Sequence, residues 1–133
     1  MDEVHPELSR IYLSDGNKND GLLYSGELYN LELNADLVTL SACQTGLGKI
    51  SRGEGVIGLS RALAYAGARR MIVSLWKVSD ASTSIMMQAF YETLLGHGGT
   101  QPAGDLRSAK LKMIESGKYT EPYYWAPFIM IGY

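Results

Sequence analysis

Two nearly continuous apolar runs stand out in the pattern of hydrophobic and polar positions along the chain. They cover residues 36–41 (DLVTLS) and 69–76 (RRMIVSLW). Runs of this kind, rich in β-forming residues and without polar alternation, are typical of strands buried inside a sheet. Residues 128–131 predict a closing strand. Residues 10–13, where polar and apolar positions alternate, predict a short one.

The segments between these runs carry apolar residues at helical spacing. We expect long helices at about 54–66, 80–95 and 102–116, and a shorter one at 25–31 for which Ser25 is a plausible N-cap. Gly67 supplies a stop for the first long helix, and Ser79 or Asp80 caps the second. The residues expected to face the core are Val56, Leu59, Ala62, Leu63 and Ala66, then Ile85, Met86, Ala89, Phe90 and Leu94, then Leu106, Ala109, Met113 and Ile114.

The alternation of strands and helices predicts an α/β domain with a largely parallel sheet. A length of 133 residues suits a single domain, residues 1–133. Twelve basic against 14 acidic residues, a net charge of −2, leave no basic surface for nucleic acid or a membrane. No apolar run approaches a membrane span, and the first residues do not resemble a secretion signal. We therefore expect a soluble cytoplasmic protein, and the single cysteine agrees with a reducing compartment.

Cys43 follows the first apolar run directly and precedes Gly46 and Gly48. Open α/β sheets carry their chemistry at the carboxyl ends of strands, so a cysteine at this point is a candidate nucleophile. A single free cysteine is more often a small buried hydrophobe than a catalyst. The segment by itself therefore leaves both interpretations open.

Three binding motifs fail on their spacing. Gly53–Gly58 matches G-x-G-x-x-G, but a long loop separates it from its strand, and no acidic residue ends the next strand. Gly46-Leu47-Gly48-Lys49 lacks both the earlier glycine and the following Ser or Thr of a phosphate-binding loop. One cysteine and two distant histidines have no metal-ligand spacing, so we expect neither a metal nor a cofactor.

A cysteine nucleophile needs a histidine as its proton acceptor, and the chain has two. His97 follows a helix that leads away from the carboxyl edge of the sheet for about 22 Å, so we expect it far from Cys43 and merely solvated. His5 precedes the first recognisable strand. A plain loop histidine is the favoured interpretation of His5, with a catalytic role as the alternative.

Taken together, the motifs resemble the CHAT family, whose caspase-like domains commonly occur with tetratricopeptide repeats. The resemblance covers nearly the whole chain in order, and Ser-Ala-Cys-Gln-Thr-Gly and Ser-Leu-Trp are its most specific motifs. It implies a three-layer caspase-like sandwich, a mostly parallel sheet with helices on both faces, in which Cys43 is the thiol nucleophile of a Cys–His dyad. It also implies a protein or peptide substrate. The stretches that carry it are residues 35–48, 53–61, 67–69, 74–80 and 125–128.

One departure from the family pattern concerns the dyad's histidine. The family has a His-Gly motif just upstream of a segment that looks like Pro6–Ser9, and here no His-Gly precedes Pro6. We therefore expect a carboxy-terminal part of the domain, incomplete at its amino-terminal side and with little or no peptidase activity alone. Gly46 and Asp80 are candidate substrate-binding residues. The alternative for Asp80 is a structural role, because an acid in the first turn of a helix interacts favourably with the helix dipole. Trp76 is expected in the core or in the wall of a pocket.

A second hypothesis is a caspase-like interaction module without chemistry. Missing strands would leave the edge near residues 10–13 unpaired, a surface that another copy of the chain or a partner protein could cover. A Rossmann-type nucleotide binder is a distant third possibility.

Overall fold

The computed structural model describes residues 10–14, 20–40 and 54–132. Their contacts divide the chain into two compact units, Met1–Lys77 with Ile129–Tyr133, and Val78–Phe128. Each unit is described by itself. Along the chain the elements are β1 (Arg10–Tyr12), β2 (Leu22–Tyr24), α1 (Ser25–Leu28), β3 (Val38–Leu40), α2 (Glu54–Tyr65), β4 (Arg70–Ser74), α3 (Asp80–Gly96), α4 (Pro102–Glu115), α5 (Pro122–Trp125) and β5 (Phe128–Gly132).

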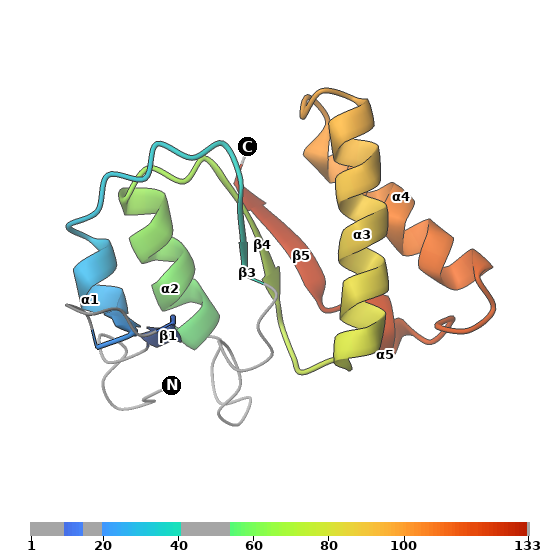
Figure 1. The fold of residues 1–133 in the computed structure, drawn as a ribbon, viewed down its shortest axis with the longest axis horizontal. Helices are drawn as coiled ribbons and strands as arrows, with labels where there is room; N and C mark the ends of the chain where they lie inside the picture. The colour runs from blue at the N-terminus through green and yellow to red at the C-terminus, as the bar shows by residue number, and fades with distance from the viewer. Residues whose placement is uncertain (1–9, 15–19, 41–53, 133) are drawn as a thin grey trace. The chain divides into compact units, whose positions relative to one another are not determined.

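The first unit contains a three-stranded sheet in the order β3-β4-β5 (Figure 1). β3 and β4 are parallel, with Val38 opposite Met71 and Leu40 opposite Val73. β4 is the most buried strand, because Met71, Ile72 and Val73 are at most 3% exposed. This confirms the prediction that the second apolar run is a buried strand.

The sheet is mixed, so the prediction of a mostly parallel sheet holds only for the β3–β4 pair. Gly132, at the end of β5, lies against the backbone of Arg69 and Arg70 at the start of β4. β5 therefore runs opposite to β4, as Figure 1 also shows. The connection explains the direction. A parallel crossover usually contains one helix, whereas α3 and α4 form a hairpin that brings the chain back before β5 begins.

Helix α2 supplies one side of the core of the first unit. Leu59, Ala62 and Leu63 are at most 3% exposed, and they pack with Met71 and Val73 from β4. Gly67 ends the helix, as predicted. Its φ of +102° is a conformation that side chains other than glycine rarely adopt, and the bond from the Ala68 N–H to the Leu63 carbonyl closes a Schellman motif.

β1 pairs with β2 on one side, and in the two-stranded sheet that the structure describes it has no second neighbour, so the unpaired edge near residues 10–13 stays a prediction. Arg10 pairs with Tyr24 and Tyr12 with Leu22 in an antiparallel register. The short helix α1 that follows begins at Ser25, with Tyr24 as its N-cap, and so the assignment of Ser25 as the cap was wrong by one residue. Glu27 accepts a hydrogen bond from the Tyr24 N–H at 2.8 Å, which satisfies a donor that the helix leaves unpaired.

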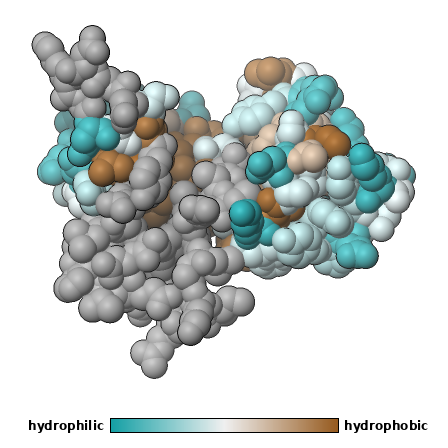
Figure 2. Space-filling model, turned by 60° about the horizontal axis from the view of Figure 1, so that its bottom comes forward, coloured by the Kyte–Doolittle hydropathy of each residue, from teal (hydrophilic) through white to brown (hydrophobic). Residues whose placement is uncertain are grey.

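The second unit is built on the antiparallel helix pair α3 and α4. Met86, Phe90, Ala109 and Met113 are at most 1% exposed and form its centre, as their spacing predicted. Ile85 was expected to face inward but is 43% exposed, because the buried side of α3 is the stripe Thr83, Met86, Phe90 and Leu94. On the face shown in Figure 2, the hydrophobic residues of this unit form separate areas between hydrophilic ones.

Both ends of α3 have well-defined caps. Ser79 is the N-cap, and its hydroxyl accepts a hydrogen bond from the Ser82 N–H at 3.2 Å. At the other end His97 is the C-cap, and Gly98 and Gly99 follow with positive φ. The Gly99 N–H donates to the Leu94 carbonyl at 2.8 Å, which completes a second Schellman motif. α4 begins after this turn with Pro102, a favourable first helical residue.

Candidate functional site

The carboxyl ends of β3 and β4 lie side by side. The parallel register places Leu40, the last residue of β3, opposite Val73, one residue before β4 ends. In open α/β sheets the loops at such ends build the binding site. Cys43, Gly46 and His5, the other candidates from the sequence, lie outside the described residues.

The chain leaving β4 is tied by a buried serine. Ser74 is 5% exposed, and its hydroxyl donates a hydrogen bond of 2.7 Å to the Trp76 carbonyl. The bond fixes the backbone directly after the strand end, and the Trp76 side chain is half-buried. The Ser-Leu-Trp motif thus forms a defined turn at the carboxyl end of β4.

Asp80 is the first residue of α3 and is exposed. Because Ser79 already caps the helix, the Asp80 carboxylate is not needed for that purpose. A negative charge in the first turn also interacts favourably with the helix dipole. The position therefore supports a purely structural role for Asp80 and equally leaves its carboxylate available to a ligand.

His97 does not have the purely solvated environment that the sequence analysis expected. Its Nδ1 lies 2.6 Å from Oδ1 of Asp105, whose side chain is only 1% exposed, while the His97 side chain is 52% exposed. Oδ2 of Asp105 is buried with no hydrogen-bond partner among the described protein atoms. The pair joins the carboxyl end of α3 to the first turn of α4. The dipole of a helix favours a histidine at its carboxyl end and a carboxylate in its first turn.

Asp105 was not among the candidate residues from the sequence. The two residues are eight positions apart, in different helices, and no periodicity within either helix relates them. A usable signal does exist. A histidine at a helix C-cap followed by an acid in the first turn of the next helix places complementary groups on both sides of a short connection.

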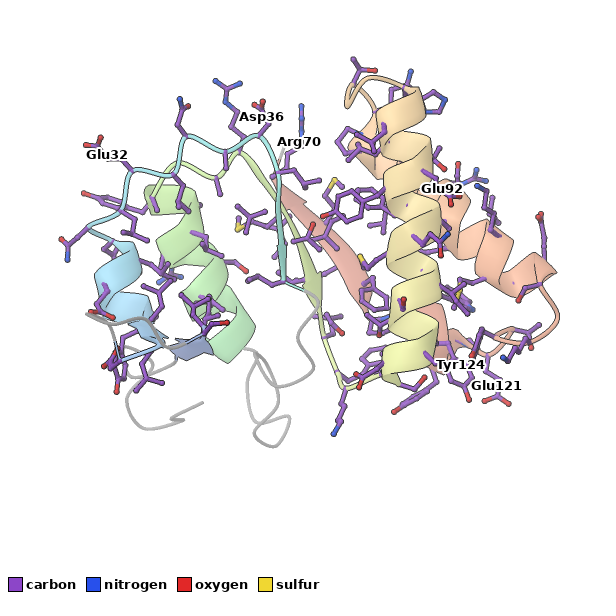
Figure 3. The ribbon with its side chains drawn as sticks, in the orientation of Figure 1. Glu32, Asp36, Arg70, Glu92, Glu121 and Tyr124 are labelled. Atoms are coloured by element: carbon purple, nitrogen blue, oxygen red, sulfur yellow. The ribbon has the colours of Figure 1, made fainter. Side chains whose placement is uncertain are left out.

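Asp36 and Arg69 form an ion pair at the amino-terminal ends of the two parallel strands, β3 and β4. Arg69 Nη1 lies 2.9 Å from Asp36 Oδ1, and both side chains are mainly exposed, at 64% and 77%. Figure 3 shows Asp36 just before β3, away from the carboxyl ends. The pair is therefore separate from the candidate site, and such exposed pairs contribute little to stability.

In residues 10–14, 20–40 and 54–132, no group of three or more His, Cys, Asp or Glu side chains is placed to hold a metal ion. Within the same ranges, no helix is both long enough and apolar enough to cross a bilayer.

Comparisons with known proteins agree on one family. The model of the CHAT domain family matches residues 1–133. Tetratricopeptide repeat protein 28 of Mus musculus is 36% identical over 112 residues, and the Homo sapiens protein of the same name is 37% identical over 112 residues. Each alignment covers 84% of this chain but only 4% of the relative, so the chain spans a small part of these proteins. No solved structure matches the chain significantly.

Proposed function

The chain belongs to the CHAT domain family, and on that premise we propose that it is the nucleophile-bearing part of a caspase-like cysteine endopeptidase domain. Cys43 is the proposed nucleophile, and a protein or peptide is the proposed substrate. The proposed architecture is the three-layer sandwich that the family resemblance implies. The names of the relatives support tetratricopeptide repeats as companions of this domain in a longer protein.

The observation that carries the proposal is the parallel pairing of β3 with β4. Leu40 ends β3 opposite Val73, and Cys43 follows Leu40 by three residues. Three residues span at most about 11 Å, so chain connectivity alone keeps the Cys43 Cα within that distance of the strand end. The carboxyl ends of parallel strands are where open α/β folds place their reactive groups.

The end of β4 supports a neighbouring substrate pocket. Trp76 follows Val73 by three residues, as Cys43 follows Leu40, and the Ser74 hydroxyl fixes its backbone. We assign the half-buried Trp76 side chain to the wall of this pocket. From the sequence, Asp80 and Gly46 stay candidate substrate-binding residues. Asp80 is exposed at the start of α3 in the second unit, and Gly46 would allow a tight loop after the nucleophile.

In the proposed reaction the Cys43 thiolate attacks the carbonyl carbon of the scissile peptide bond. A carbon–sulfur bond forms, the π electrons move to the oxygen, and the backbone N–H of Cys43 donates a hydrogen bond to that oxyanion. Collapse of the intermediate breaks the C–N bond, and the departing amine must receive a proton. Water then hydrolyses the thioester, which releases the acid product and restores the thiol.

Neither histidine of the chain is the favoured partner for the proton transfers in this scheme. His97 is the C-cap of α3, and its Nδ1 is engaged by Asp105. His5 stays a weaker candidate. Without an imidazole a free thiol is only a few per cent ionised at pH 7, and the amine has no acid to protonate it. We therefore propose that this chain alone has little or no peptidase activity.

Turnover of a broad peptide library tests both parts of the proposal. The unassisted chain should cleave no more than its Cys43→Ser variant, whereas added imidazole, which replaces the missing proton acceptor, should produce weak Cys43-dependent cleavage. Clear cleavage by the unassisted chain would overturn the proposed inactivity. A longer reading frame with an upstream His-Gly supplies a second assay, and an inactive thiol there as well would overturn the peptidase assignment.

The second candidate function is a non-catalytic interaction module. In the two-stranded sheet that the structure describes, β1 has a neighbouring strand, β2, on one side only, and the edge near residues 10–13 is the proposed docking surface. An edge of this kind can accept a strand from a second copy or from another protein. Sedimentation tests this alternative, because a monodisperse monomer at high concentration would count against self-association.

A further inference from the structure

We draw no further inference here: the strongest candidate, the exposed apolar surface formed by Tyr29, Leu31, Leu33 and Tyr65 beside α1 and the end of α2, carries nothing because nothing in the structure shows what covers it.

Discussion

His97 and Asp105 join the two helices of the second unit through a contact of 2.6 Å between Nδ1 and Oδ1. The carboxylate is almost fully buried and the imidazole is half-exposed. A buried carboxylate without a partner is costly. The main contribution of His97 to stability is therefore its hydrogen bond to the Asp105 carboxylate rather than its own packing. The pair therefore bridges the turn at residues 97–101 between α3 and α4.

Replacing the histidine should cost more than neutralising the acid. We expect His97→Ala to lower the free energy of unfolding by about 2 kcal/mol, because it leaves the Asp105 carboxylate buried and unpaired. Asp105→Asn should cost less, since its side-chain oxygen can still accept the Nδ1 proton. The double variant His97→Ala/Asp105→Ala should cost less than the sum of the two single alanine variants.

Urea denaturation of these variants measures the differences, with the exposed Glu115→Ala of α4 as a control that should change little. Purely additive alanine effects, or a His97→Ala variant as stable as the control, would contradict a coupled pair.

Gly132 should not tolerate a side chain. Its φ is +115°, and an added Cβ would overlap the Arg69 carbonyl oxygen and lie 2.9 Å from the Arg70 Cα. Both are backbone atoms of the neighbouring strand and cannot rotate away. We expect Gly132→Ala to destabilise the protein by about 2 kcal/mol or more, from backbone strain and from displacement of β5.

Gly96→Ala is the matched control for that substitution. Gly96 lies in α3, and nothing approaches an added Cβ within 4 Å. Because alanine favours a helix more than glycine does, this variant should be as stable as the parent or more stable by up to about 1 kcal/mol. Thermal unfolding of both variants decides the matter, and similar losses in the two would refute the close approach of β5 to β4.

Lys110 should reduce stability at neutral pH. Burial lowers the pKa of its ammonium below the ordinary value of 10.5, because desolvation disfavours the charged form. The unfolded chain therefore binds more protons than the folded protein just below pH 10.5, and stability rises with pH through that interval. At pH 7 the lysine is charged in both states, and the desolvation cost is fully present.

Lys110→Met removes this cost while keeping a flexible side chain. We expect a gain of at most about 0.5 kcal/mol at pH 7, since the group is only partly buried, and a smaller gain above pH 10. The exposed Lys112→Met should show neither effect. Denaturation curves at pH 7 and above pH 10 make the comparison, and a gain that grows with pH would contradict the stated direction.

Local signals predicted most elements of the fold. The 3.6-residue period located α2, α3 and α4, and Gly67 predicted the end of α2, because these helices depend on one buried stripe and on local capping. The unbroken apolar run predicted β4 because that strand is buried.

Long-range relationships were not accessible in the same way. The β1–β2 pairing, the reversed direction of β5 and the His97–Asp105 contact join residues that no local period relates. Of the candidate site, the sequence predicted the strand before Cys43, whereas the second strand, expected to reach Trp76, ends at Ser74 in the structure. The parallel register that brings these two ends together came only from the structure.

The chemical reactivity of Cys43 tests the central claim most directly, because it is the only cysteine in the chain and any thiol label reports on it alone. The measurement is the rate of iodoacetamide alkylation of the native chain relative to the chain unfolded in urea. We predict that the native thiol reacts at a rate within about tenfold of the unfolded one, as expected for a nucleophile exposed at a strand end. A thiol that is modified only when the protein unfolds would place Cys43 in the core and contradict the peptidase assignment.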